Sequence, residues 1–211
     1  MEDQVESMLS FPVIDTTTGF NDVFDKAFIN KTLPYSLEYT IAPTYFERCD
    51  FIKRFGYFIP TMELIDVILH LNGFWLSIGC GRGYTEHIMR MNGINIISTD
   101  KYPIEINPYF SGDGHLINNY TNIELMDAEA AIKQYPDRHV FMSWASKDES
   151  WAFDACKNIQ PGNYLIYAGD YKNVADRKFY RLLDTKFVKL IEVKGMSFNE
   201  INDTVSIYIK N

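Results

Sequence analysis

The sequence predicts an α/β fold: a Rossmann-like, doubly wound and mostly parallel sheet with helices on both faces and an antiparallel strand pair at its C-terminal end. Three observations predict it. From residue 61 onward, short apolar runs alternate with helical patterns. A glycine-rich turn follows the first of these runs, and two β-rich runs near the C-terminus have only a loop between them. Strands that alternate with helices imply a parallel sheet covered on both sides.

The expected elements follow one another in a regular order. Apolar residues recur at helical spacing from Thr61, and Asn72-Gly73 is a typical end for that helix. Strands are expected at 74–78, 94–98, 122–126, 140–144 and 164–168. Helices are expected at 84–91, 128–134, around 151–158 and at 176–183.

The C-terminal end departs from this alternation. The runs at 187–193 and 204–209 are β-rich, and the residues between them contain Gly195 and Asn199 but no clear helical pattern. Parallel neighbours need a crossover of about a dozen residues or more, whereas antiparallel neighbours do not. The sequence therefore predicts an antiparallel pair that closes one edge of the sheet.

Length and composition indicate one main domain. The chain has 211 residues, of which 46% are hydrophobic and 15% aromatic, enough for a sizeable core. We expect residues 46–211 to form this domain. Residues 1–45 have irregular patterning with many aromatics, and we expect them to form an N-terminal extension that acts as a lid.

Charge and cysteine content exclude several classes of protein. The net charge of −8 argues against broad binding to nucleic acid or anionic lipid, although basic residues gather between 172 and 189. The sequence has no run of 18 apolar residues, so no membrane-spanning helix is expected. Cys49, Cys80 and Cys156 are too widely spaced for a disulfide framework or a zinc pair, which favours a reducing, cytoplasmic location.

The glycine-rich turn is the central motif. Its sequence, from residue 76 to 84, is Leu-Ser-Ile-Gly-Cys-Gly-Arg-Gly-Tyr. A dinucleotide fingerprint, G-x-G-x-x-G, would place its third glycine at position 84, which is Tyr84. The third glycine is instead Gly83, and the resulting G-x-G-x-G turn with Gly79 and Gly81 fits S-adenosylmethionine, which has no pyrophosphate. An ordinary tight turn is the alternative.

Two acids follow the next two strands. Asp100 comes 21 residues after Gly79, where a carboxylate can bind both hydroxyls of a ribose. Asp127, followed by Ala128, lies where a side chain can reach an adenine amine. Each aspartate has a structural alternative, because Asp also caps turns and helix N-termini.

Several segments together resemble a known family. The chain is similar to a group of small, largely uncharacterised class I S-adenosylmethionine-dependent methyltransferases over roughly residues 54–183. The resemblance is carried by Tyr57-Phe58-Ile59-Pro60 with Glu63-Leu64, the 77–84 turn, Asp100, Phe141-Met142-Ser143-Trp144 and Tyr164-Leu165-Ile166-Tyr167. It implies the fold and S-adenosyl-L-methionine as cofactor, but not the substrate. The cofactor contacts that we expect are Tyr57, Pro60, Gly79, Gly81, Gly83, Tyr84, Asp100, Asp127, Ala128 and Ser143.

This chain departs from the family at two places. Family members usually carry an acid where this chain has Ser77, and that acid helps to order the cofactor pocket. A Trp-Pro-Pro motif follows the fourth strand in the family, and here Ala145-Ser146 replace the prolines. Methylation of nucleic-acid bases needs a rigid proline clamp, so its loss argues against a base substrate.

Candidate catalytic groups follow the fourth and fifth strands. Methyl transfer depends largely on positioning and desolvation, so no universal catalytic residue is required. Ser143, Trp144 and Ser146 are candidates for the acceptor site, with Asp148 or Asp170 as a proton acceptor, although loop carboxylates commonly serve as caps. Among the histidines only His115 is a candidate for substrate contact, and no metal-ligand spacing is present.

The expected function is methyl transfer from S-adenosylmethionine to a small-molecule or protein acceptor, with no membrane partner. A methyltransferase-like domain without activity, serving as a binding partner or scaffold, is the alternative. A nicotinamide-dependent oxidoreductase is the third interpretation, disfavoured by Tyr84 and the C-terminal strand pair.

Overall fold

The computed structural model describes residues 48, 51–52, 55–103, 106–107, 119–194 and 201–211. The expected lid at 1–45 and His115 lie outside these residues. Five helices and seven strands are described. The helices are α4 (Met62–Leu71), α5 (Tyr84–Met91), α6 (Ala128–Gln134), α7 (Trp151–Cys156) and α8 (Arg177–Lys186). The strands are β1 (Trp75–Ile78), β2 (Ile96–Asp100), β3 (Glu124–Leu125), β4 (His139–Ser143), β5 (Tyr164–Asp170), β6 (Phe187–Lys194) and β7 (Asp203–Lys210).

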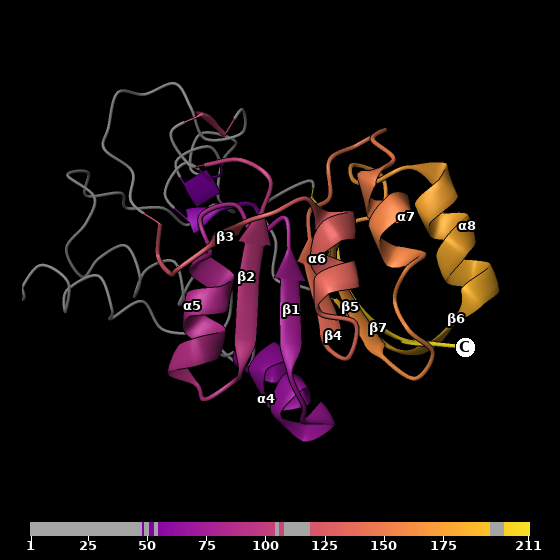
Figure 1. Ribbon diagram of the computed structural model, residues 1–211, viewed down its shortest axis with the longest axis horizontal. Coiled ribbons are helices and arrows are strands. Elements are labelled where there is room, and N and C mark those ends of the chain that lie inside the picture. Colours follow the sequence, from indigo (N-terminus) through magenta and orange to yellow (C-terminus); the bar gives the residue numbers. More distant parts are fainter. Residues whose placement is uncertain (1–47, 49–50, 53–54, 104–105, 108–118, 195–200) are drawn as a thin grey trace, which may run out of the picture.

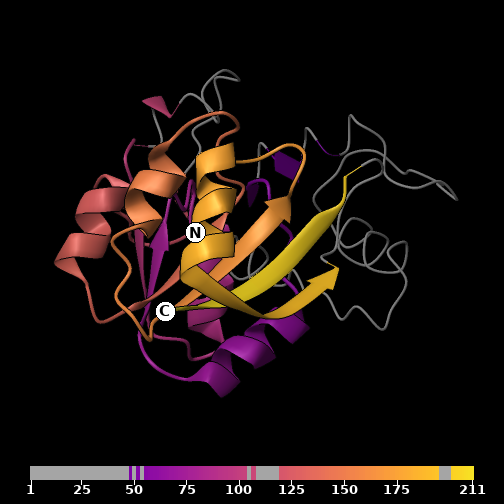
Figure 2. The same cartoon turned by 90° about the vertical axis from the view of Figure 1, so that its right-hand side faces the viewer.

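The seven strands form one sheet in the order β3-β2-β1-β4-β5-β7-β6. The five strands from β3 to β5 are parallel, whereas β7 runs antiparallel to both β5 and β6. The predicted fold class and the antiparallel C-terminal pair are therefore confirmed. In Figure 2 the orange α8 crosses in front of the strands at this end of the sheet.

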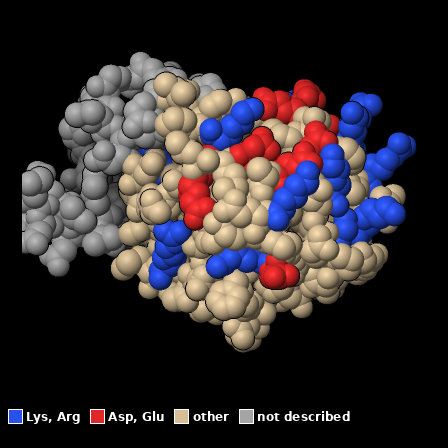
Figure 3. All heavy atoms as spheres, viewed as in Figure 1, with Lys and Arg blue, Asp and Glu red and all other residues tan. Residues whose placement is uncertain are grey.

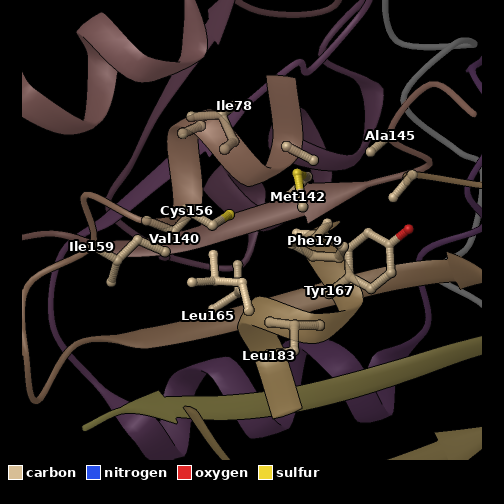
Figure 4. Packing of buried hydrophobic residues seen from close by; sticks show 14 of the residues in the cluster. Ile78, Val140, Met142, Ala145, Cys156, Ile159, Leu165, Tyr167, Phe179 and Leu183 are labelled. Atoms are coloured by element: carbon tan, nitrogen blue, oxygen red, sulfur yellow. The ribbon is translucent and has the colours of Figure 1, made fainter. Parts of the chain in front are cut away.

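One face of the sheet is covered by α6, α7 and α8, which lie side by side in Figure 1. Alternate residues of the strands point to this face, as expected for a period of two. Figure 4 shows Val140, Met142 and Leu165 of the sheet packed against Phe179 and Leu183 of α8. All five are buried, and they belong to the larger of the two core clusters among the described residues.

The other face is covered by α4 and α5. The intervening strand residues Trp75, Phe141 and Ile166 point to it and pack with the apolar sides of these two helices. Each of the three is at most 1% exposed. Because both faces are buried, the central strands are near-continuous apolar runs, as is typical of a parallel sheet.

Most boundaries agree with the sequence to within two residues; α8 ends three residues later than expected, at Lys186, and β2 is shifted by two residues. The strand was expected from residue 94, but it begins at Ile96. Ile94 belongs to the turn that ends α5, where its backbone N–H donates to the carbonyl of Met89 at 3.0 Å. Its side chain is buried in the core, so the apolar run begins two residues before the strand does.

The basic cluster is a solvent-exposed surface. In Figure 3, Lys and Arg side chains gather at the right-hand side of the molecule, over α8. The exposed members are Lys172, Arg177, Lys178, Arg181, Lys186 and Lys189. No helix in the described part of the chain is long and apolar enough to cross a membrane.

Candidate functional site

A pocket of about 430 Å³ lies where the strand order changes direction, at the carboxyl ends of β1 to β4. In open α/β sheets ligands bind at this point, because the loops that leave neighbouring strands diverge there. The pocket is lined by Gly79 after β1, Asp100 at the end of β2, Asp127 after β3 and Ser143 at the end of β4. Tyr57, from the segment before α4, closes one side.

The glycine turn brings the backbone close to this pocket. Gly79, Gly81 and Gly83 all have positive φ, between 59° and 72°, a conformation that side chains disfavour. At Gly79 a Cβ would come 3.0 Å from the ring of Trp151, which also lines the pocket. A side chain at Gly79 would therefore both strain the turn and press on the wall opposite.

The N–H groups of the turn are largely used within the protein. Cys80 N–H donates to the carbonyl of Thr99 at 3.0 Å, and Gly83 N–H donates to the carbonyl of Cys80 at 3.0 Å. Gly81 N–H donates to Oδ2 of Asp100 at 2.8 Å. These three N–H groups are thus occupied, which leaves the turn poorly suited to cradle a pyrophosphate.

Asp100 connects the turn to the end of β2. Its second oxygen, Oδ1, accepts from the N–H of Tyr102 at 3.0 Å, so the carboxylate is fixed from both sides. Burial raises the pKa of Asp100 above its ordinary value, against the effect of these backbone donors. A carboxylate oxygen has two lone pairs, so each retains capacity to accept from a ligand.

A second buried acid, Glu86, lies in the first turn of α5. Its Oε1 accepts from the hydroxyl of Ser77 on β1 at 2.6 Å, and both side chains are at most 2% exposed. Its Oε2 has no hydrogen-bond partner among the described residues, and Glu86 lines the pocket. Burial raises the pKa of Glu86 to about 7, although the Ser77 hydroxyl, the backbone N–H of Glu86 itself and Arg90 favour the charged form. A carboxylate thus stands beside Ser77, the position at which an acid was expected from the resemblance and is absent.

Asp127 has the structural role that its position allowed, and it also lines the pocket. Its side chain accepts from the N–H of Glu129 at 3.0 Å and caps α6. The following residue, Ala128, lines the pocket with Met126. Both interpretations of Asp127 therefore remain compatible with its geometry.

Aromatic rings form the wall beyond Ser143. Tyr57 and Trp144 stack with their ring centroids 5.5 Å apart, and both line the pocket. The guanidinium of Arg48 lies over both rings, 5.1 Å from the centroid of Trp144. Trp144 has a positive φ of 48°, rare for a bulky residue, and this backbone turn ends β4 and directs the chain along the pocket.

The structure brings most of the predicted contacts together. The predicted residues that line the pocket are Tyr57, Gly79, Gly81, Tyr84, Asp100, Asp127, Ala128, Ser143, Trp144 and Ser146. Four predicted residues do not line it. Pro60 is buried beside the N-terminus of α4. Gly83 packs against Thr121, whose side chain would come within 2.5 Å of a Cβ added at Gly83.

The two proposed proton acceptors are also outside the pocket, for reasons that the tertiary structure supplies. Asp148 has a φ of 60° and donates its backbone N–H to the carbonyl of Ala175, which turns its side chain outward. Asp170 is 2% exposed and accepts from Lys172, Asn173 and Asn202. Although burial opposes it, these donors hold the pKa of Asp170 below its ordinary value, as expected for a loop anchor.

Four charged groups of the pocket were not expected from the sequence: Glu86, Lys101, Lys147 and Glu149. The described lining thus holds four acids and two lysines, the remaining two acids being Asp100 and Asp127. The pocket therefore favours a ligand with positive charge. A signal for Glu86 was present, because it lies in the first turn of the helix that follows the glycine turn. No three His, Cys, Asp or Glu side chains group as metal ligands in the described part of the chain.

Two solved structures with a TM-score of at least 0.50 share the fold of this chain. The PH0226 protein from Pyrococcus horikoshii OT3 is 13% identical, with a TM-score of 0.52, over 78% of this chain and 92% of that chain. TehB from Haemophilus influenzae is 12% identical, with a TM-score of 0.50, over 78% of this chain and 67% of that chain. A TehB-like SAM-dependent methyltransferase from Corynebacterium glutamicum is 14% identical, with a TM-score of 0.47, over 70% of this chain and 86% of that chain.

No protein-family model and no curated protein matches the sequence. The chain has the Rossmann-like fold of class I methyltransferases, as the sequence analysis expected from the motifs around Gly79. At these levels of identity the likeness extends to the fold alone.

Proposed function

We propose that this protein binds S-adenosylmethionine in the pocket beside Gly79 and transfers its methyl group to a small-molecule or protein acceptor. The observation that carries the proposal is the arrangement of the glycine turn and Asp100 at the strand-order switch. The glycine turn lets a ligand approach the backbone closely. Asp100 lies at the end of β2, where it can accept hydrogen bonds from ribose hydroxyls.

The charges of the pocket support a cationic ligand rather than a dinucleotide. S-adenosylmethionine carries an ammonium and a sulfonium, and its carboxylate is its single anionic group. Acids outnumber lysines in the lining, and no arginine is among the described residues that line it. A pyrophosphate would lie beside Glu86 and Asp100 with few unoccupied N–H groups to bind it.

The bound sulfonium would supply an activated methyl group: the acceptor's electron pair forms the bond to carbon, the carbon–sulfur bond breaks, and sulfur keeps its electrons. The described residues would orient the two reactants and exclude water. Asp100 and Asp127 are placed for the adenosyl part. Ser143, Ser146 and the Tyr57–Trp144 stack line the side that remains for an acceptor.

The test is binding first and transfer second. Thermal unfolding is measured with S-adenosylmethionine, its demethylated product S-adenosylhomocysteine, and NAD. A ligand at one hundred times its Kd stabilises a protein by about 2.7 kcal/mol, so the first two should raise Tm and NAD should not. The absence of any shift with either adenosyl compound at millimolar concentration contradicts the proposal.

A second candidate is a binding domain that does not catalyse transfer. It is favoured by one observation: neither Asp148 nor Asp170 lines the pocket, so neither candidate base is positioned to take a proton. Methyl-labelled S-adenosylmethionine, incubated with the protein and with pools of metabolites and peptides, separates the two. Label in a product supports transfer, whereas saturable binding with no labelled product supports the second candidate.

A further inference from the structure

Glu86 lines the pocket, and one oxygen of its buried carboxyl has no partner among the described residues. It is 2% exposed, and Ser77 binds one of its oxygens at 2.6 Å. The other oxygen, Oε2, is buried and has no hydrogen-bond partner among the described residues, while the residue itself lines the pocket. A buried carboxylate in this state is costly when ionised, unless a donor reaches it.

The described side chains around Glu86 do not supply that donor. Arg90, one turn further along α5, donates to the carbonyl of Ile96 and to the hydroxyls of Ser98 and Thr121. The Asp100 carboxylate on β2 carries the same sign of charge. The Cys80 thiol, in the glycine turn, has a pKa well above its ordinary value because of burial, Glu86 and Asp100, so it stays neutral. The pocket is therefore the direction from which a cation can reach Oε2.

We infer that Glu86, held in place by Ser77, receives the ammonium group of the ligand's methionyl part. This inference rests on the proposed function. An ammonium has three N–H donors and can satisfy Oε2 with a short, charge-assisted hydrogen bond. A sulfonium has no N–H or O–H donor, so it cannot satisfy that oxygen, although it is also cationic.

The inference predicts a dependence of affinity on pH. Burial raises the pKa of Glu86 to about 7, so the ligand-free carboxyl is largely neutral at pH 6. An ammonium partner favours the ionised carboxylate, and binding then releases a proton. Affinity for an amino-acid-bearing ligand should therefore rise roughly fivefold to tenfold between pH 6 and pH 7.5. Arg90, Asp100 and Cys80 are the charged or titratable groups that act on Glu86.

The experiment is calorimetric titration with three ligands: S-adenosylmethionine, S-adenosylhomocysteine and 5′-methylthioadenosine, which lacks the amino-acid part. The variants are Glu86→Gln and, as a matched control on the surface of α6, Glu129→Gln, whose partner is the exposed Lys133. Glu86→Gln should lower the affinity for both amino-acid-bearing ligands tenfold or more and leave the affinity for 5′-methylthioadenosine unchanged. Glu129→Gln should leave all three unchanged.

The other outcomes each overturn the inference. A loss confined to S-adenosylmethionine would make the sulfonium the partner, and an equal loss with all three ligands would make Glu86 a structural residue. Wild-type binding of the adenosyl ligands without any effect of Glu86→Gln refutes the inference and leaves the proposed function standing. Failure of the wild type to bind any of them refutes both. If Glu86→Gln does not fold, the pH dependence of binding to the wild type decides. An affinity that rises with pH for all three ligands, including 5′-methylthioadenosine, contradicts the inference, and so does an affinity that rises for none of them.

Discussion

Glu86 should weaken the fold of the ligand-free protein as pH rises, and its replacement by glutamine should remove that effect. The unfolded chain holds the Glu86 proton with an ordinary pKa of 4.5, whereas the folded protein holds it with a pKa of about 7. Between these values the folded state binds more protons than the unfolded state, so stability falls as pH rises. The fall is complete above pH 7 and absent below pH 4.5.

The size of the effect follows from the two pKa values. Their difference corresponds to about 3 kcal/mol of unfolding free energy between pH 4 and pH 8. Glutamine carries no charge and keeps an oxygen for the Ser77 hydroxyl, so it resembles the neutral carboxyl at every pH. Glu86→Gln should therefore be more stable than the wild type by about 3 kcal/mol at pH 8 and by about 1 kcal/mol or less at pH 5.

Urea unfolding of both proteins at pH 5, 6, 7 and 8 measures this difference. Asp203, at the start of β7, needs to be separated from it, because burial raises the pKa of Asp203 to about 7 as well. Asp203 is present in both proteins, so its contribution cancels in the difference between them. If the difference in unfolding free energy does not change between pH 5 and pH 8, burial does not raise the pKa of Glu86 in the folded protein.

Three further predictions follow from the site and the surface. Asp100→Ala should weaken S-adenosylhomocysteine binding roughly tenfold to a hundredfold in calorimetry, since it removes the ribose acceptor and the anchor of Gly81; unchanged binding by a folded variant would leave Asp100 as a turn cap. Gly83→Ala should lower Tm more than Gly93→Ala, because both have positive φ but only the first places a Cβ against Thr121; equal losses would mean that backbone strain alone matters. Duplex DNA should bind no more tightly than about 1 μM at physiological salt, because the protein is acidic and its exposed basic cluster is small; tighter binding in a fluorescence-anisotropy titration would contradict this.

Local pattern predicted much of the fold. The bounds of α5 and α6 agree with the sequence, because their apolar spacing, the asparagine after α5 and the aspartate cap before α6 are all local signals. The start of β2 was placed too early because Ile94 is apolar but belongs to the turn that ends α5, not to the strand. A buried turn residue and a buried strand residue look alike in sequence.

The site was predicted where neighbouring residues define it and missed where distant ones do. Gly79 and Asp100 follow strands, and the carboxyl ends of parallel strands meet in space. Asp148 and Asp170 lie at or after strand ends too, but distant hydrogen bonds determine where they point. The backbone N–H of Asp148 donates to the carbonyl of Ala175, and Asn173 and Asn202 donate to the carboxylate of Asp170. The position of Glu86 depends on Ser77 in another element, and a first-turn glutamate is otherwise explained by the helix dipole.

The most direct test of the proposed site is a crystal structure of the protein with S-adenosylhomocysteine. We expect the ligand in the pocket at the carboxyl ends of β1 to β4, with its ribose hydroxyls on Asp100, its adenine beside Asp127 and Ala128, and its ammonium on Oε2 of Glu86. A ligand bound at another site, or one in this pocket with its ribose away from Asp100, would contradict it.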